Sequence, residues 1–157
     1  MMNLKLLLKK LSAPVSKHAG WIFAALALVG FSDASYLTAK HYLGTPINCS
    51  IFGDCDKVTT SAYSAIWGIP VALFGAIYYI FIFLLAIWYL DSKKESILYF
   101  IASATAVGFL ASVWFLYLQL FVIGALCLYC IISAITSTLL FITGLIVLKY
   151  RETNPQE

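Results

Sequence analysis

Four long apolar segments dominate the pattern of hydrophobic and polar positions along the chain. Each reaches or exceeds the roughly 20 residues that bridge the hydrocarbon core of a bilayer. In lipid each segment must be a helix, because only a helix satisfies its own backbone hydrogen bonds there. The pattern predicts an all-α integral membrane protein, a bundle of four transmembrane helices over Gly20–Leu43, Ile69–Leu90, Ser96–Phe121 and Leu126–Leu148.

A shorter amphipathic pattern precedes the first span. Leu4, Leu7, Leu8 and Leu11 recur at the spacing of one helix face, with lysines on the other side. This pattern predicts an N-terminal amphipathic helix on an anionic membrane surface. A solvated basic tail is the alternative. We therefore expect an amphipathic segment, a four-helix membrane domain and a tail, over residues 1–19, 20–148 and 149–157.

The composition of the 157-residue chain supports a membrane protein. It is 62% hydrophobic and 11% charged, whereas a soluble domain is about 45–50% apolar and about 25% charged. These values exclude a water-soluble domain, a disordered chain and a nucleic-acid binder. The net charge of +3 is too small to imply an acidic partner. The expected surroundings are the lipid membrane.

The basic residues predict how the four spans are oriented. Eight of the ten fall on one face of a four-span arrangement, which is cytoplasmic by the positive-inside rule. Both termini are then cytoplasmic, and the long loop Gly44–Gly68 is extracytoplasmic. We expect the protein in the cell (inner) membrane. The eight residues are Lys5, Lys9, Lys10, Lys17, Lys93, Lys94, Lys149 and Arg151.

The four cysteines form two pairs on the predicted extracytoplasmic side. Cys49 and Cys55, the loop pair, lie in the long loop, and Cys127 and Cys130, the helix pair, form a CxxC that opens the fourth span. Disulfides persist in that oxidising compartment. Charge and cysteine placement therefore agree on the topology.

The two pairs are suited to different partners. A helix N-terminus favours a thiolate at the helix pair, which makes a better leaving group and a more oxidising disulfide. At the membrane boundary this pair can meet a lipid-soluble oxidant. The loop pair faces water, so it can meet a soluble thiol protein and pass electrons inward by disulfide exchange.

Other uses of four cysteines remain open at the level of sequence. They can be structural disulfides, and sequence does not choose among the three possible pairings. A four-thiolate zinc site is a further alternative that an oxidising compartment opposes. Haem attachment is excluded, because Ile131 stands where CxxCH needs histidine.

Two further features are candidates for the site. Asp33 falls just past the middle of the first span, and an intramembrane carboxylate is functional by default, as a proton relay or polar lining. A packing hydrogen bond to a neighbouring helix is the alternative. Residues 57–66, which contain Ser61, are predicted to form an amphipathic lid helix.

These features together resemble the vitamin K epoxide reductase family, in particular its bacterial and archaeal homologues, over about residues 20–148. The resemblance rests on Cys49-x5-Cys55, Ser61 six residues later, Gly68-Ile69-Pro70 at the second span and the CxxC opening the fourth. It implies a four-helix bundle around a quinone (ubiquinone or menaquinone), capped by the long loop.

The resemblance also implies roles for individual residues. Cys49 would exchange with a thioredoxin-fold partner, Cys55 would relay to Cys127, and Cys130 would lie beside the quinone ring. Ser61 matches the family's loop serine, and Asp33 lies in a similar stretch of the first span. Many prokaryotic homologues carry a fused thioredoxin-like domain. The sequence here ends at Glu157, after the four spans, so we expect a separate DsbA-like partner.

The sequence therefore predicts a membrane thiol:quinone oxidoreductase that makes disulfide bonds. Two alternatives remain: a vitamin K quinone or epoxide reductase, and a non-enzymatic scaffold with structural disulfides. The vertebrate enzymes carry a tyrosine where this chain has Ala134, which weakens the case for reduction of vitamin K epoxide. The DsbB family does similar chemistry with four helices, but its CxxC lies in the first outer loop.

Overall fold

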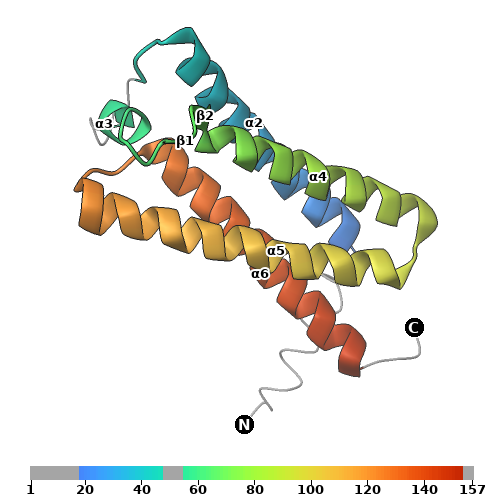
Figure 1. Cartoon of the computed structure of the whole chain (residues 1–157). Coiled ribbons are helices and arrows are strands. Elements are labelled where there is room, and N and C mark those ends of the chain that lie inside the picture. Colours follow the sequence, from blue (N-terminus) through green and yellow to red (C-terminus); the bar gives the residue numbers. More distant parts are fainter. Residues whose placement is uncertain (1–17, 48–54, 154–157) are drawn as a thin grey trace.

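The structure is a computed structural model that describes residues 18–47 and 55–153. The predicted amphipathic helix at residues 4–11 and Cys49 lie outside this range. Four long helices cross one another as a bundle (Figure 1): α2 (Ala19–Leu43), α4 (Val71–Ser92), α5 (Glu95–Tyr117) with its continuation η1 (Leu118–Ile123), and α6 (Leu128–Thr153).

The four predicted spans are confirmed as helices long and apolar enough to cross a membrane. Each predicted bound lies within two residues of the corresponding span, over Ala19–Leu43, Val71–Ser92, Glu95–Ile123 and Leu128–Tyr150. Large apolar side chains also face outward; the exposed fractions of Val107, Leu110 and Phe121 are 66%, 67% and 74%. Helices that are apolar on their outer side are stable in lipid rather than in water.

The core of the bundle is formed where α2 packs along α4 and α6. Phe23, Ile82, Leu98 and Leu140 are almost completely buried there. Two glycines let tyrosines of α4 enter the interior, because a methyl group on Gly30 would meet the Tyr79 ring and one on Gly108 would meet Tyr78. These two rings therefore reach the centre of the bundle.

The segment between Cys55 and α4 differs from the lid helix predicted for residues 57–66. Only α3 (Cys55–Thr59) is helical, and the chain then turns into a two-stranded hairpin of β1 (Ala65–Ile66) and β2 (Ile69–Pro70). The hydroxyl of Ser61 donates to the Val58 carbonyl at 2.8 Å, which competes with continued helix. That part of the prediction was wrong.

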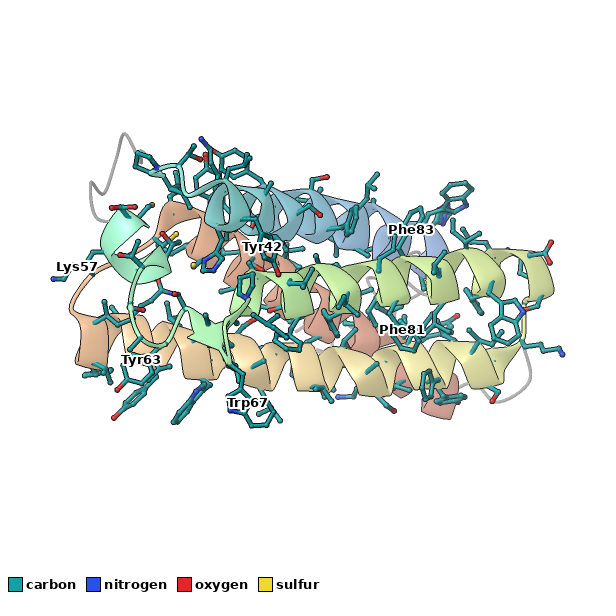
Figure 2. All side chains as sticks on the ribbon, turned by 45° about the horizontal axis from the view of Figure 1, so that its top comes forward. Tyr42, Lys57, Tyr63, Trp67, Phe81 and Phe83 are labelled. Carbon is teal, nitrogen blue, oxygen red and sulfur yellow. The ribbon has the colours of Figure 1, made fainter. Side chains whose placement is uncertain are left out.

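A tight turn closes this hairpin. Trp67 and Gly68 both have positive φ, 53° and 80°, as the two central residues of a type I′ turn require. The side chain of Trp67 is fully exposed and points away from the bundle (Figure 2). The hairpin and α3 thus form a cap over one end of the four helices (Figure 1).

Candidate functional site

The cap brings one cysteine of the loop pair to the start of α6. Cys55 is fully buried, and its Sγ accepts a hydrogen bond from the backbone N–H of Leu128 at 3.3 Å. Cys55 is disulfide-bonded, whereas Cys127 and Cys130 are free thiols. Cys49 lies outside the described residues. Residues 73 positions apart therefore meet at the CxxC.

Cys127 is the residue just before the first residue of α6. Its carbonyl accepts the N–H of Ile131 at 3.0 Å, which is the first backbone bond of the helix. Its sulfur accepts hydrogen bonds from the Cys130 thiol and from the N–H groups of Cys130 and Tyr129. Cys127 thus caps the helix with its sulfur, in the way that a serine oxygen caps other helices.

These contacts favour a thiolate at Cys127. The pKa of Cys127 is lowered to about 7 from an ordinary value of 9.0, and the hydrogen bond from the Cys130 thiol is the largest cause of this shift. Burial raises the pKa of Cys127, and the two backbone N–H groups lower it. A negative charge on Asp33 raises it. The thiolate form of Cys127 is therefore more accessible near neutral pH than that of an ordinary cysteine.

Gln119, in the π-helical turn η1, holds the segment that leads into the CxxC. Its side-chain oxygen accepts the N–H of the buried Cys127 at 3.1 Å, and its backbone oxygen accepts the N–H of Ala125, also at 3.1 Å. Gln119 was not predicted as a site residue. Its signal in the sequence is that it is a lone glutamine within an apolar span, because such polar groups are costly in lipid unless they serve the site or the packing.

A cavity of about 310 Å³ lies beneath the cap, between the four long helices. Small-molecule sites occupy about 300–1,000 Å³ and have mostly apolar walls with a few polar groups. This cavity matches that description. Its apolar and small lining residues include Ala34, Leu37, Val58, Pro70, Ala72, Phe74, Val107, Gly108, Ala111, Phe115, Leu118, Ile123 and Ala134.

Two residues of the cavity wall, one on α4 and one on α5, also reach the outer surface of the bundle. Phe74 from α4 and Val107 from α5 line the cavity and are also exposed on the outside of the bundle, with exposed fractions of 48% and 66%. A flat ring inside can therefore keep an apolar tail in the bilayer.

Two buried polar atoms on the cavity wall have no hydrogen-bond partner among the described residues. They are Oδ2 of Asp33 and the hydroxyl of Tyr78. Buried polar atoms nearly always have a partner, so this pair points to a polar ligand. A quinone fits, because its ring suits the apolar walls and its two oxygens can accept hydrogen bonds.

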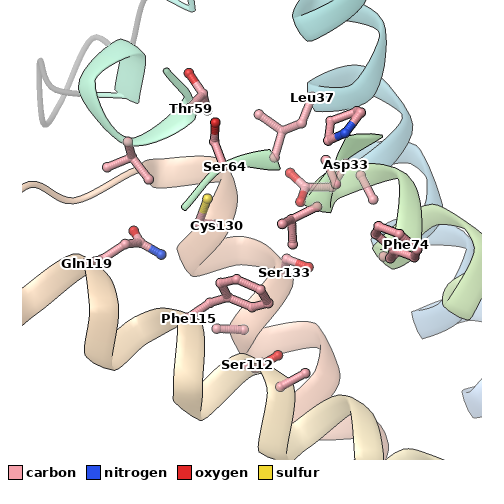
Figure 3. Close-up of a pocket in the computed structure, with 18 of the residues that line it drawn as sticks. Asp33, Leu37, Thr59, Ser64, Phe74, Ser112, Phe115, Gln119, Cys130 and Ser133 are labelled. Carbon is pink, nitrogen blue, oxygen red and sulfur yellow. The ribbon is translucent and has the colours of Figure 1, made fainter. Parts of the chain in front are cut away.

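Several residues named from the sequence meet around this cavity. Asp33, Ser61 and Cys130 line it, and Figure 3 shows Asp33 on α2 and Cys130 on α6 reaching it from different helices. Cys127 and Cys55 are buried in one cluster, against which Cys130 packs. The cysteines therefore run from the cap to the cavity in the order Cys55, Cys127, Cys130.

The sequence analysis missed other polar groups on the cavity wall. Tyr78 and Tyr79 come from the second span, and the Tyr79 hydroxyl donates to the Ser133 carbonyl at 2.9 Å. His41, at the end of α2, also lines the cavity. The sequence shows Tyr78 and Tyr79 only as two tyrosines within an apolar span, and the close approach at glycines shows that they point inward.

The sequence model of the vitamin K epoxide reductase family matches residues 21–145 of the chain. The match covers most of the chain, including the segments that carry the cysteines and the cavity. No curated protein matches the chain.

Proposed function

The chain belongs to the vitamin K epoxide reductase family, and on that premise we propose that it is a thiol:quinone oxidoreductase that makes disulfide bonds. Enzymes of this family are membrane oxidoreductases that use quinones. The finer proposal is that electrons enter from a protein dithiol, pass through the loop pair and the helix pair, and reduce a quinone in the cavity.

The single observation that carries this proposal is that the cap brings Cys55 to the start of the CxxC, whose second cysteine lines the cavity. The backbone N–H of Leu128, the residue after Cys127, donates a hydrogen bond to the sulfur of Cys55, and Cys130 lines the cavity. Thiol–disulfide exchange requires direct attack of one sulfur on another. The arrangement supports a relay in which Cys55 reacts with Cys127, and Cys130 reacts with the quinone.

Two exchange steps move the electrons from the loop pair to the helix pair. With the loop pair reduced and the helix pair oxidised, the thiolate of Cys55 attacks Cys127 and the Cys127–Cys130 bond breaks, leaving the electron pair on Cys130. Cys49 then attacks Cys55, and the Cys55–Cys127 bond breaks with Cys127 leaving as a thiolate. The lowered pKa of Cys127 makes it a good leaving group in this step.

The state described by the structure matches the product of these steps. Cys55 is disulfide-bonded, and both cysteines of the helix pair carry thiols. The electrons are then stored beside the cavity, on Cys127 and Cys130. A bound quinone supplies an acceptor for two electrons and two protons, and Cys130, Ser61 and Tyr78 are placed on the wall that would hold it.

We further propose a separate, DsbA-like thioredoxin-fold protein as the electron donor outside the cytoplasm. Lys93 and Lys94 lie at the α4–α5 turn, at the opposite end of the bundle from the cap. The positive-inside rule then assigns the cap to the extracytoplasmic side. In that orientation Cys49 and Cys55 serve exported proteins.

The two alternative functions draw less support from the site. Ala134 lines the cavity with a methyl group, so position 134 lacks the tyrosine hydroxyl that the vertebrate enzymes have there. A scaffold with static bridges does not account for two free thiols beside a cavity with unpartnered polar atoms. A direct assay of vitamin K epoxide turnover distinguishes the first alternative from the proposed function.

The proposal is tested by quinone absorbance during incubation with a reduced DsbA-like protein. Wild type should reduce ubiquinone or menaquinone, and Cys130→Ala should fall to the rate without enzyme, because no sulfur then faces the ring. Ser103→Ala, on the exposed face of α5, is the matched control and should keep the wild-type rate. Full activity of Cys130→Ala would remove the mechanism.

A further inference from the structure

Asp33 is the only carboxyl group among the described residues that line the cavity. It lies within α2, well inside the first span, and its Oδ2 is buried without a hydrogen-bond partner among the described residues. In Figure 3 its side chain points into the cavity across from Cys130. The structure therefore does not support a packing bond from this oxygen to a neighbouring helix.

The surroundings of Asp33 favour a neutral carboxylic acid. An unpaired charge in an apolar, membrane-embedded site is costly, and no lysine or arginine is among the described residues that line the cavity. A neutral carboxyl group carries a proton that it can transfer. Its position beside the site of electron transfer makes that proton available to a reacting oxygen.

We propose that Asp33 is a catalytic acid that donates a proton to a quinone oxygen while the helix pair closes into a disulfide. This inference rests on the proposed function and adds the source of one proton. General acid catalysis needs a protonated group within reach of the developing charge. The orphaned oxygen and the shared cavity meet that requirement.

The proton count requires such a donor. Closing the Cys127–Cys130 disulfide releases two electrons, and a hydroquinone takes up two electrons and two protons. Cys130 supplies its thiol proton, but Cys127 as a thiolate has none to give. Asp33 supplies the second proton and is left as a carboxylate. Of the two protons that the loop pair gives up, one goes to Cys130 and the other passes to solvent, so the cycle balances once Asp33 is reprotonated.

One face of α2 offers a route for that reprotonation. Asp33, Leu37 and His41 follow at intervals of four residues and all line the cavity. Eight residues of helix span about 12 Å, and His41 at the far end is exposed to the outside. The cavity wall on α2 therefore extends from Asp33 to the exposed end of the helix, the side from which we expect Asp33 to be reprotonated.

The charge on Asp33 also couples the two halves of the cycle. The pKa of Cys127 is set mainly by the Cys130 hydrogen bond, which lowers it, but a negative charge on Asp33 raises it. An ionised Asp33 therefore makes Cys127 a poorer leaving group. Reprotonation of Asp33 favours the next transfer from the loop pair.

Asp33→Asn tests the proposal, because asparagine keeps the size and hydrogen bonding of the side chain but has no proton to transfer. We expect quinone reduction to fall by about 10²-fold or more, the usual contribution of a general acid. Quinone affinity, measured by quenching of intrinsic fluorescence, should stay within about threefold because the amide can still hydrogen-bond. Asp33→Glu should recover part of the rate.

Asp91→Asn is the matched control. Asp91 is exposed in the last turn of α4, at the end of the bundle away from the cavity. The same change of carboxyl to amide there should leave the rate and the quinone affinity unchanged. The thermal unfolding midpoint of all three variants checks that each one folds.

Infrared spectroscopy gives a readout that does not depend on turnover. The protein with its helix pair reduced should show a carboxylic acid C=O band that is absent from Asp33→Asn and present in Asp91→Asn. Its absence from wild type would mean that Asp33 is ionised and would overturn the proposal. A wild-type rate in Asp33→Asn would also overturn it while leaving the proposed function intact, whereas a wild type that reduces no quinone would refute the proposed function itself.

Discussion

At the scale of single residues, the position of one sulfur atom decides the direction of the proposed relay. Cys127 is buried and caps α6. Its sulfur accepts a hydrogen bond from the Cys130 thiol, which stabilises the Cys127 thiolate. Cys130, one turn further on, lines the cavity instead. The same CxxC thus presents a leaving group to the loop pair and a donor to the quinone.

The ionisation of Cys127 can be measured. Because its pKa is lowered to about 7, thiolate is abundant above that pH and is lost as the pH falls through it. The rate at which N-ethylmaleimide modifies Cys127, followed by mass spectrometry, should therefore reach half its maximum near pH 7. In Cys130→Ala the midpoint should rise toward the ordinary value of 9.0, since the strongest stabilising hydrogen bond is gone. An unchanged midpoint would contradict this origin of the shift.

Residue types in the sequence predicted part of this site. Paired cysteines and a carboxylate in an apolar span are rare enough to point to chemistry on their own, and Asp33 and Cys130 do line the cavity. Tyr78 and Gln119 were not predicted, because their roles depend on contacts made in the folded bundle. For Tyr78 that contact is with Gly108, 30 residues away.

At the scale of secondary-structure elements, the π-helical turn η1 links the third span to the CxxC. The backbone oxygen of Gln119 accepts the N–H groups of Gly124 and Ala125, and its side chain accepts that of Cys127. π-helical turns are rare and often occur at functional sites. Here the turn fixes the place where α6 begins and hence where both thiols lie.

Replacing Gln119 tests this structural role. Gln119→Ala leaves the buried N–H of Cys127 without an acceptor, which should cost about 1–3 kcal/mol of stability. Slower quinone reduction should accompany the loss, because Cys127 is no longer held beside Cys55. Gln119→Glu keeps an acceptor oxygen and should restore most of both properties. Thermal unfolding and the quinone assay measure the two effects, and a fully stable, fully active Gln119→Ala would refute the role.

The shape of the cap illustrates what local sequence patterns miss. Residues 57–66 have an amphipathic spacing that favours a helix, but the helix ends at Thr59. Ser61 and Ser64 bond to nearby backbone carbonyls, which stabilises a turn instead. The competing turn allows both Val58 and Ser64 to reach the cavity.

At the scale of the whole molecule, the spans were predictable and their arrangement was not. Long apolar runs fix the number and the bounds of membrane helices, because the bilayer sets the length. All four helices are apolar around most of their circumference, so no periodic polar face indicates which sides meet. The cavity arises only when α2, α4, α5 and α6 are packed together under the cap.

The central claim is that both cysteine pairs are connected to one quinone site. It is tested most directly by counting the quinone molecules that a fully reduced chain converts to hydroquinone under anaerobic conditions, with excess quinone and no other reductant. Four cysteines form two disulfides, so the relay predicts two quinones reduced per wild-type chain. It predicts one in a variant in which Cys49 and Cys55 are both replaced by alanine, because only the helix pair remains. A wild type that stops at one quinone, or reduces none, would contradict the account.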